Sequence, residues 1–367
     1  MRAVDEDWWT RILCGSEEGN LRAPSSDEKY IALPRVADPR VVVDSASKQA
    51  MRDAMQRFIE NRAGAAAGLL SEGASRVFAR RRADWTVASS SSTLREHLSE
   101  LLGSDLRLSI AVGPPRPNLK PIVRCYEGST LRAVAKMGPD PHTASMVANE
   151  GDWLEQFAKH PFDDFVTPEL LHRGTFGSSE LLVMVPFETQ GSSSVSIDSI
   201  PLDYIRAFDA RNTSDTVKAS SWWRGLETRL SDPTLAKFAN IAAELAADDR
   251  FQLLKPSMWH GDWSPWNIGR LHDGRTLIWD WERTADGVPM GFDLLHLHYQ
   301  YGEGTDAARS DLERIGVPVE NHQVMTTAYF LELVARHHEG GAMHGDRQAQ
   351  VEAQLATLWP TKSGGVR

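Results

Sequence analysis

The sequence predicts an α+β protein in which a small β-rich segment precedes a mainly helical one. Short apolar runs separated by Pro and Gly lie between residues 105 and 190, and apolar residues recur at helical spacing through most of residues 191–367. A chain of 367 residues is long enough for two or three packed units. We therefore expect an N-terminal extension or cap over residues 1–104, a β-rich domain over 105–190 and a helical domain over 191–367.

The N-terminal segment combines extended and helical patterns. Residues 30–43 include prolines and read as extended chain, whereas residues 45–82 carry Met51, Met55 and neighbouring apolar side chains at helical spacing. A second helix is expected over residues 93–102. We expect this segment to have a packing role rather than a separate catalytic one.

The middle segment contains three consecutive strand patterns, LRLSIAVG, PIVRCYEG and LRAVAKM, and the last two are joined tightly through Gly128 and Ser129. A helix is expected over residues 143–159, and LLVMVPF at 181–187 reads as another buried strand. This order of elements suits a small lobe that holds a nucleotide.

The last segment is interrupted between its helices by a polar loop and a hairpin. The loop is HGDWSPWNIG, at residues 260–269, and the hairpin turns at Asp273 and Gly274 before the apolar strand TLIW. We expect the chemistry of the protein at this loop and hairpin.

Composition limits the classes of partner. The protein has a formal net charge of −10, so it lacks the excess of basic residues that is typical of a nucleic-acid binder. An anionic membrane surface would repel it. Cys14 and Cys125 are the only cysteines, which argues against a disulfide framework and favours a reducing cytoplasm. No run of eighteen apolar residues and no signal peptide is present, so we expect a cytoplasmic protein. The oligomeric state is not readable from the sequence.

Three oxygen-bearing side chains follow a spacing that suits phosphoryl transfer. His260, Asp262 and Asn267 form the pattern H-x-D-x-x-x-x-N, and Asp280 ends the strand that follows. Such a reaction needs a carboxylate to accept the proton of the acceptor hydroxyl and oxygen ligands that hold Mg²⁺ against the phosphates. We expect Asp262 to be the base, and Asn267 and Asp280 to be the metal ligands.

These motifs resemble the aminoglycoside phosphotransferase and choline kinase family, a branch of the protein-kinase-like fold. HGDWSPWN is similar to the family's catalytic loop, in which Gly usually stands where protein kinases have Arg; IWDWE is similar to its metal-binding strand end, and GFDLLHLHY to the next helix. The resemblance implies a bilobal fold with a β-rich N-lobe and a mainly helical C-lobe, here preceded by a helical extension. It also implies transfer from ATP, with Mg²⁺, to a small-molecule alcohol, with His260 structural and Asp293 supporting the loop.

The resemblance carries further expectations for the β-rich lobe. Lys136 is similar to the lysine that grips the α- and β-phosphates, and Glu150 to the helix glutamate that pairs with it. The loop GPPRPNLKP lacks the usual glycines, so the phosphate cover would depend on Asn118, Arg116 or Lys120. Adenine is expected against the linker near Phe187.

Other residues near the loop have two interpretations. Trp263 either packs in the core or touches substrate, and Glu282 either binds an acceptor amine or hydroxyl or forms a structural ion pair. His337, His338 and His344 suggest a metal only weakly, because adjacent histidines on a helix point to different sides.

The sequence leaves two other functions open. A pseudokinase or regulatory nucleotide-binding module is favoured only by the altered glycine loop, and a protein kinase is disfavoured because Asp-Trp-Glu replaces Asp-Phe-Gly. The acceptor is undetermined, with a slight preference for a sugar, amino sugar or aminoglycoside over amino alcohols, and the choice between ATP and GTP is open.

Overall fold

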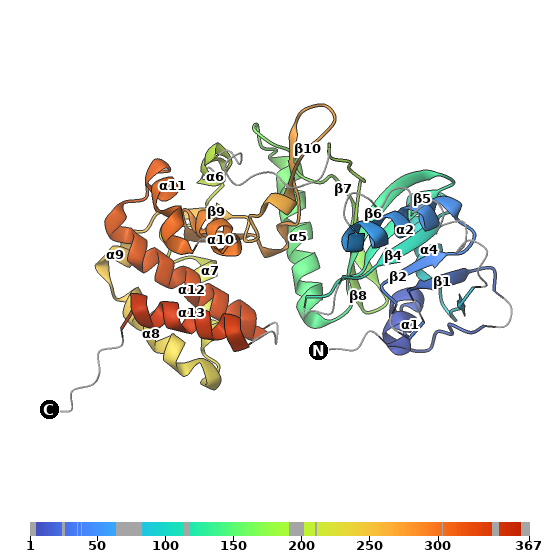
Figure 1. Ribbon diagram of the computed structural model, residues 1–367, viewed down its shortest axis with the longest axis horizontal. Coiled ribbons are helices and arrows are strands. Elements are labelled where there is room, and N and C mark those ends of the chain that lie inside the picture. The colour runs from blue at the N-terminus through green and yellow to red at the C-terminus, as the bar shows by residue number, and fades with distance from the viewer. Residues whose placement is uncertain are drawn as a thin grey trace. The chain divides into compact units, whose positions relative to one another are not determined.

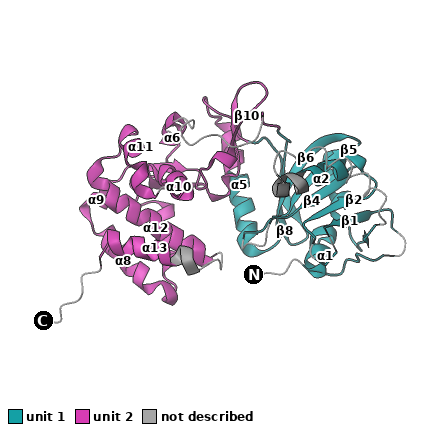
Figure 2. Cartoon of the chain, in the orientation of Figure 1, with its two compact units in different colours: residues 1–152, 168–187 teal, residues 153–167, 188–367 magenta. Residues whose placement is uncertain are grey.

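The computed structural model describes residues 5–23, 26–34, 36–37, 39–63, 83–113, 118–190, 202–209, 211–302, 304–339 and 345–360. Contacts between Cα atoms divide the chain into two compact units, coloured separately in Figure 2: unit 1 comprises residues 1–152 and 168–187, and unit 2 comprises residues 153–167 and 188–367. Among the described helices none has the length and apolar character needed to cross a bilayer.

Unit 1 is built on an antiparallel sheet with the strand order β3-β1-β2-β4-β5-β6-β8-β7 (Figure 1). Each pairing in this order is antiparallel, and β4, β5, β6 and β8 are consecutive neighbours. The strands are β1 (Lys29–Leu33), β2 (Val41–Asp44), β3 (Trp85–Thr86), β4 (Arg107–Ala111), β5 (Ile122–Glu127), β6 (Thr130–Gly138), β7 (Leu170–Phe176) and β8 (Ser179–Met184).

Helices cover both faces of the sheet, and the alternation of side chains along β1 explains why. Tyr30 and Ala32 pack with α1 (Glu6–Cys14) and α4 (Leu94–Leu102) in one hydrophobic cluster. Ile31 and Leu33 point to the other face and pack with α2 (Lys48–Ala63) in a second cluster. Since successive residues of a strand face opposite sides, a continuous apolar strand buried on both sides is the expected result. The first cluster also contains the buried Cys14 and Cys125.

Local signals set the ends of several elements in unit 1. Thr93 caps α4 with its side chain, and Glu96 returns the bond to the backbone of Thr93, which is a complete capping box. Gly128, in the left-handed conformation, lies in the turn between β5 and β6. Helix α5 (Pro141–Lys159) follows β6, and the boundary between the two units falls within it.

Unit 2 is mainly helical and contains two short antiparallel strand pairs, β10 with β11 and β12 with β9. The α-helices are α6 (Leu202–Asp209), α7 (Ser221–Leu230), α8 (Ala236–Ala246), α9 (Asp249–Gln252), α10 (Phe292–Gln300), α11 (Arg309–Arg314), α12 (His322–Glu339) and α13 (Gly345–Leu358). The strands are β9 (Pro256–Trp259), β10 (Ile268–Arg270), β11 (Thr276–Ile278) and β12 (Ala285–Pro289). The 3₁₀ helices are η3 (Pro233–Leu235), η4 (Pro265–Asn267), η5 (Trp281–Arg283), η6 (Thr305–Ala308) and η7 (Val319–Asn321).

An aromatic cluster forms the part of the unit 2 core that lies against the polar loop after β9. Trp281 packs on Phe157 with ring centroids 4.8 Å apart and on His260 at 4.5 Å. Phe208 meets Trp281 at 5.9 Å and Trp263 at 5.5 Å, both edge to face. The loop therefore stands on a packed aromatic base.

Most elements expected from the sequence are present. The patterns at 106–113, 121–128, 131–137 and 181–187 correspond to β4, β5, β6 and β8, and the hairpin at 269–282 to β10 and β11. Helix α4 begins at Leu94, one residue after the expected start, and α5 begins at Pro141, two residues before it. Helix α2 falls within the expected helical region, of which residues 64–82 lie outside the described part of the chain. Strands β3, β7, β9 and β12 were not expected.

The three-segment division remains a prediction, and the structure adds one fact to it. Strands β1, β2 and β3 of the expected extension join the same sheet as β4, through the pairing of β2 with β4. The described residues between 5 and 104 thus contribute to both hydrophobic clusters of unit 1.

Candidate active site

The polar loop of unit 2 begins directly after β9 and turns sharply at Gly261. This glycine has φ +82°, and a Cβ placed on it would lie 2.4 Å from the carbonyl oxygen of Arg283. No side chain fits there without displacing backbone, which explains why the loop carries Gly where the protein-kinase pattern has Arg. The turn sends the loop through η4 into β10.

His260 is fully buried and bonded at both ring nitrogens by the main chain. The backbone N–H of Asp262 donates to Nδ1 at 3.2 Å, and Nε2 lies 3.0 Å from the carbonyl oxygen of Trp279. A carbonyl only accepts and an amide N–H only donates, so the proton sits on Nε2 of a neutral ring. Burial lowers the pKa of His260 to about 4, which keeps the ring neutral at physiological pH. Its role is therefore to connect the loop to β11.

Asp293 lies at the start of α10 and supports the same loop. Its carboxylate accepts from the backbone N–H of His260 at 2.7 Å and from that of Gly261 at 3.0 Å. Burial raises the pKa of Asp293 to about 7, although both hydrogen bonds oppose this rise. Two bonds to consecutive amides fix the direction in which the loop leaves β9.

Asp262 and Asn267 are held together within one loop. The side-chain nitrogen of Asn267 donates to the backbone oxygen of Asp262 at 2.9 Å and to its carboxylate Oδ2 at 3.0 Å. The amide nitrogen is occupied by these bonds, so the amide oxygen of Asn267 is the atom suited to a cation. The side chain of Asp262 is 26% exposed, enough to meet a bound molecule.

A histidine that sequence reasoning missed holds the other carboxylate oxygen of Asp262. The Nε2 atom of His296, on α10, lies 3.3 Å from Oδ1, and its Nδ1 lies 3.1 Å from the hydroxyl of the buried Tyr329. Because the carboxylate accepts, Nε2 carries the proton and Nδ1 accepts from Tyr329. Burial lowers the pKa of His296, so the ring is neutral. Burial would raise the pKa of Asp262, but the hydrogen bond from His296 opposes this rise and the pKa is lowered, leaving an ionised carboxylate.

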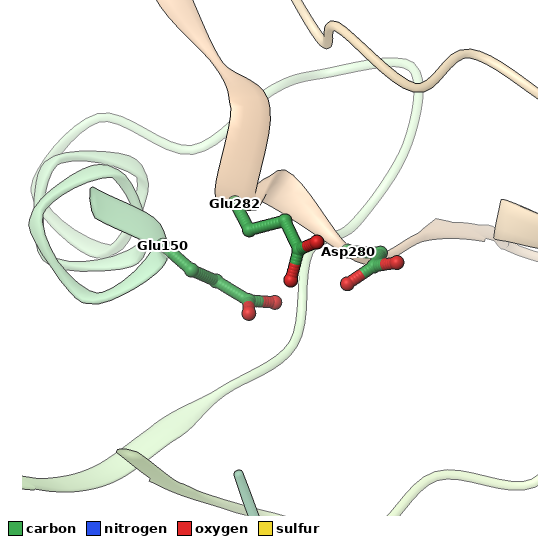
Figure 3. Close-up of side chains that lie close together, drawn as sticks. All are labelled: Glu150, Asp280 and Glu282. Carbon is green, nitrogen blue, oxygen red and sulfur yellow. The ribbon is translucent and has the colours of Figure 1, made fainter. Parts of the chain in front are cut away.

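Asp280 and Glu282 bring two carboxylates together after β11 (Figure 3). Their oxygens lie within 4.8 Å of one another. Asp280 has φ +72°, the only positive φ of a described non-glycine residue. This left-handed conformation costs about 1 kcal/mol or more, and among residues other than glycine it is tolerated best by Asn and Asp; such strain is common at functional sites. Carboxylate oxygens at this separation, like the Asn267 amide oxygen, are donors that suit Mg²⁺.

Unit 1 contains its own polar feature, an ion pair between β6 and α5. The Nζ atom of Lys136 lies 2.7 Å from both carboxylate oxygens of Glu150, which is itself fully buried. Without Glu150 the ammonium group of Lys136 would be free to turn toward solvent. The ion pair holds this group at one position on the sheet.

The remaining expected residues lie in different surroundings. Trp263 is fully buried between Phe208 and His260, which favours its packing interpretation, whereas Trp266 in the same loop is 49% exposed. Phe187 lies three residues after the end of β8 and is 38% exposed. Asn118 is partly buried and Lys120 is buried, whereas Arg116 falls in residues 114–117, outside the described chain.

Glu282 is buried, with 7% of its surface exposed.

The histidines at the end of α12 lie in different surroundings. His338 pairs with Asp232 at 3.3 Å, and both side chains are partly exposed. His337 lies beside it on α12, and His344 is outside the described residues. The described part of this helix end thus has the character of a solvated surface.

Arg336 is a second residue that sequence reasoning missed. Its Nη1 donates to the carbonyl oxygen of Gly261 at 2.7 Å, and its guanidinium lies 4.3 Å from the ring centre of Trp259. A long-range contact of this kind has no local signal in the sequence. The only sequence sign of His296 was its place three residues after Asp293, one helical turn along the same face.

These features define the class of fold. An antiparallel sheet with a Lys–Glu pair precedes a helical unit that carries an Asp–Asn loop and a following carboxylate, and this is the protein-kinase-like fold of the aminoglycoside phosphotransferases. No family model matches the chain, and no curated protein matches it.

Comparison with solved structures identifies particular proteins with this fold. A thermostable mutant of aminoglycoside phosphotransferase APH(4)-Ia in its apo form has a TM-score of 0.51 and 13% identity, and the match covers 74% of this chain and all 100% of that one. A ternary complex of a mutant of the same enzyme with ADP and hygromycin B has a TM-score of 0.50 and 14% identity, covering 74% and 99%. At these identities the similarity establishes the fold.

Proposed function

We propose that this protein is a small-molecule kinase that transfers the γ-phosphoryl group of ATP, with Mg²⁺, to a hydroxyl group. The observation that carries the proposal is the pairing of Asp262 with Asn267, because it fixes an ionised, partly exposed carboxylate beside an amide oxygen suited to a cation. The kinase-like fold supports the same activity. ADP and hygromycin B are bound by the APH(4)-Ia mutant; for this chain, nucleotide use and a hydroxylated acceptor are part of the proposal.

The proposed chemistry depends on position and charge. Asp262 accepts a hydrogen bond from the acceptor hydroxyl, directs its oxygen at the phosphorus and takes the proton as the new O–P bond forms. Asn267 and His296 each hold one of its carboxylate oxygens, so the carboxylate is oriented before the acceptor arrives. In unit 1, Lys136 is proposed to bind the α- and β-phosphates while Glu150 holds its ammonium.

The proposed magnesium ligands are Asn267 and Asp280, with Glu282 as a neighbouring carboxylate. When bound, Mg²⁺ would neutralise the negative charge of the phosphates. His260 is not available as a base, because the main chain occupies both of its ring nitrogens.

Two variants test the proposal in the full-length protein. Asp280→Asn keeps a residue that tolerates the left-handed backbone but removes a charge, so Mg-ATP binding measured by calorimetry should weaken at least about tenfold. Asp262→Asn should leave Mg-ATP binding within about twofold of wild type and lower kcat by about a hundredfold or more, as expected for loss of a general base. Wild-type turnover in both variants would refute the mechanism.

The alternative of a pseudokinase makes the opposite prediction for the wild type. It would bind Mg-ATP or no nucleotide, yet release no ADP with any member of a panel of sugars, aminoglycosides and amino alcohols. Phosphate transfer to one panel member, lost in Asp262→Asn, would exclude it.

A further inference from the structure

A cavity of about 290 Å³ lies at the C-terminal end of α10 in unit 2. Side chains from α10, η6, α12 and α13 line it, including Tyr299, Gln300, Thr305, Phe330, Gln350 and Gln354. We propose that this cavity binds the phosphoryl acceptor, and that the acceptor is a neutral polyhydroxylated molecule of about monosaccharide size. The inference rests on the proposed kinase function, which it makes more specific.

One lining residue lies between the cavity and the proposed base. The side-chain nitrogen of Gln300 lies 3.3 Å from Nε2 of His296, and that same Nε2 lies 3.3 Å from Oδ1 of Asp262. Tyr299, Gln300 and His296 share a face of α10 because they are three or four residues apart. The cavity is therefore separated from the imidazole that holds Asp262 by the side chain of Gln300, and an acceptor seated in it would extend one hydroxyl past Gln300 to reach the carboxylate.

The chemistry of the lining selects hydroxyl groups. Gln300, Gln350 and Gln354 each offer an amide that both donates and accepts, which matches the dual character of an alcohol. The rings of Tyr299 and Phe330 meet edge to face with centroids 5.7 Å apart and offer apolar surface to the C–H face of a sugar ring.

Charge and size narrow the class further. Among the described residues that line the cavity none is charged, so an ammonium group on the part of the acceptor that lies within the cavity would lose water without gaining a carboxylate partner there. Pockets for drug-sized ligands typically have volumes of about 300–1,000 Å³, so this cavity stands at the small end. A polycationic antibiotic of several rings fits neither feature, whereas a single neutral ring fits both.

Matched sugar pairs test the charge preference. We would measure ADP release from Mg-ATP by the wild-type protein with glucose and glucosamine, galactose and galactosamine, mannose and mannosamine, and with myo-inositol. The proposal expects myo-inositol or the neutral member of at least one pair to be phosphorylated, with a KM about tenfold or more below that of any amine tested. Preference for the amine in the pairs that react would overturn it.

Variants of α13 test the location. The double variant Gln350→Ala with Gln354→Ala should raise the KM for the neutral acceptor about tenfold or more, as expected for the loss of two hydrogen bonds, while the KM for ATP stays within about twofold. Thr357→Ala, on the same helix but outside the lining, is the matched control and should change neither value. An unchanged acceptor KM in the double variant would refute this site.

Saturation-transfer NMR separates this inference from the proposed function, because it detects binding without turnover. Neutral sugar binding that is lost in the double variant, in a protein that transfers no phosphate, would support the cavity and refute the kinase proposal. Phosphate transfer that the double variant leaves unchanged would support the kinase proposal and refute the cavity as the acceptor site. Absence of binding by every neutral sugar in the panel would overturn the cavity proposal.

Discussion

At residue 261 the absence of a single Cβ determines the course of the catalytic loop. The backbone is left-handed there, and the carbonyl of Arg283 occupies the space that a side chain would need. Both main-chain groups of Gly261 are bonded by side chains from elsewhere in the unit. Its N–H donates to Asp293, and its carbonyl oxygen accepts from Arg336. Loop geometry at this site is thus set by main-chain contacts, which any added side chain would disturb.

We predict that Gly261→Ala lowers the free energy of unfolding by about 2–4 kcal/mol, from the left-handed backbone together with the clash. Gly274→Ala is the matched control: its φ is +87° but nothing lies within 4 Å of the added Cβ, so the loss should be about 1 kcal/mol. Urea denaturation measures both. Equal losses would show that the contact with Arg283 is relaxed without cost.

At the scale of elements, α12 holds α7 and the catalytic loop through a buried charge network. Glu332 accepts from Trp222 Nε1 at 3.0 Å, from Arg229 Nη1 at 3.1 Å and from Arg336 Nε at 2.7 Å. Arg336 in turn reaches Gly261. Removal of one partner from such a buried group leaves charge uncompensated, so the network favours one arrangement of these elements over others.

This network gives a specific dependence of stability on pH. Burial would raise the pKa of Glu332, but the charges of Arg229 and Arg336 outweigh it and lower the pKa from 4.5 to about 2. A carboxyl with a lowered folded pKa stabilises the protein fully above pH 4.5, and that contribution is lost as pH falls toward 2. About 3 kcal/mol should disappear over this window.

The measurement compares wild type with Glu332→Gln by urea denaturation between pH 2 and pH 7. The difference in unfolding free energy should be largest above pH 4.5 and shrink toward pH 2, because only the wild type carries the titrating group. A difference independent of pH would contradict the assigned role of Glu332. Glu244→Gln, at an exposed site on α8 bonded to Trp359, provides a control expected to change little.

At the scale of the whole molecule, three strands from the N-terminal hundred residues, β1, β2 and β3, are part of the sheet on which unit 1 is built. Strand β4 pairs with β2 on one side, and the cluster that includes Trp9 and Leu98 also includes Leu108 and Val123 from later strands. We predict that a chain beginning at residue 105 would be insoluble or lack cooperative unfolding, since it exposes the edge of β4 and much of the core.

Expression of residues 105–367 beside the full chain, with calorimetric unfolding of each, measures this. A soluble fragment with a sharp thermal transition equal to that of the full chain would show that residues 1–104 are a dispensable cap. Removal of the last residues beyond 360 is the control deletion.

The parts of the fold and site that the sequence predicted were those encoded locally. The contact between Asp262 and Asn267 and the hairpin that turns at Gly274 were predictable because each joins residues that are close together in the chain. Strand β7 was missed because its residues are largely half-exposed rather than forming an apolar run, as suits a strand at the sheet edge. Contacts between distant residues, such as His296 with Asp262, needed the tertiary structure because nothing in either segment specifies the partner.

The two thiols of unit 1 offer a way to follow that unit alone. Cys14 and Cys125 are buried in the same hydrophobic cluster, and burial raises their pKa values to about 11 and about 12, so neither is a thiolate in the native state. The sequence has no other cysteine. The rate of covalent labelling by a thiol reagent would therefore measure how often the core of this sheet opens. A nucleotide that lowers this rate would be shown to bind and stabilise unit 1, without any assay of turnover.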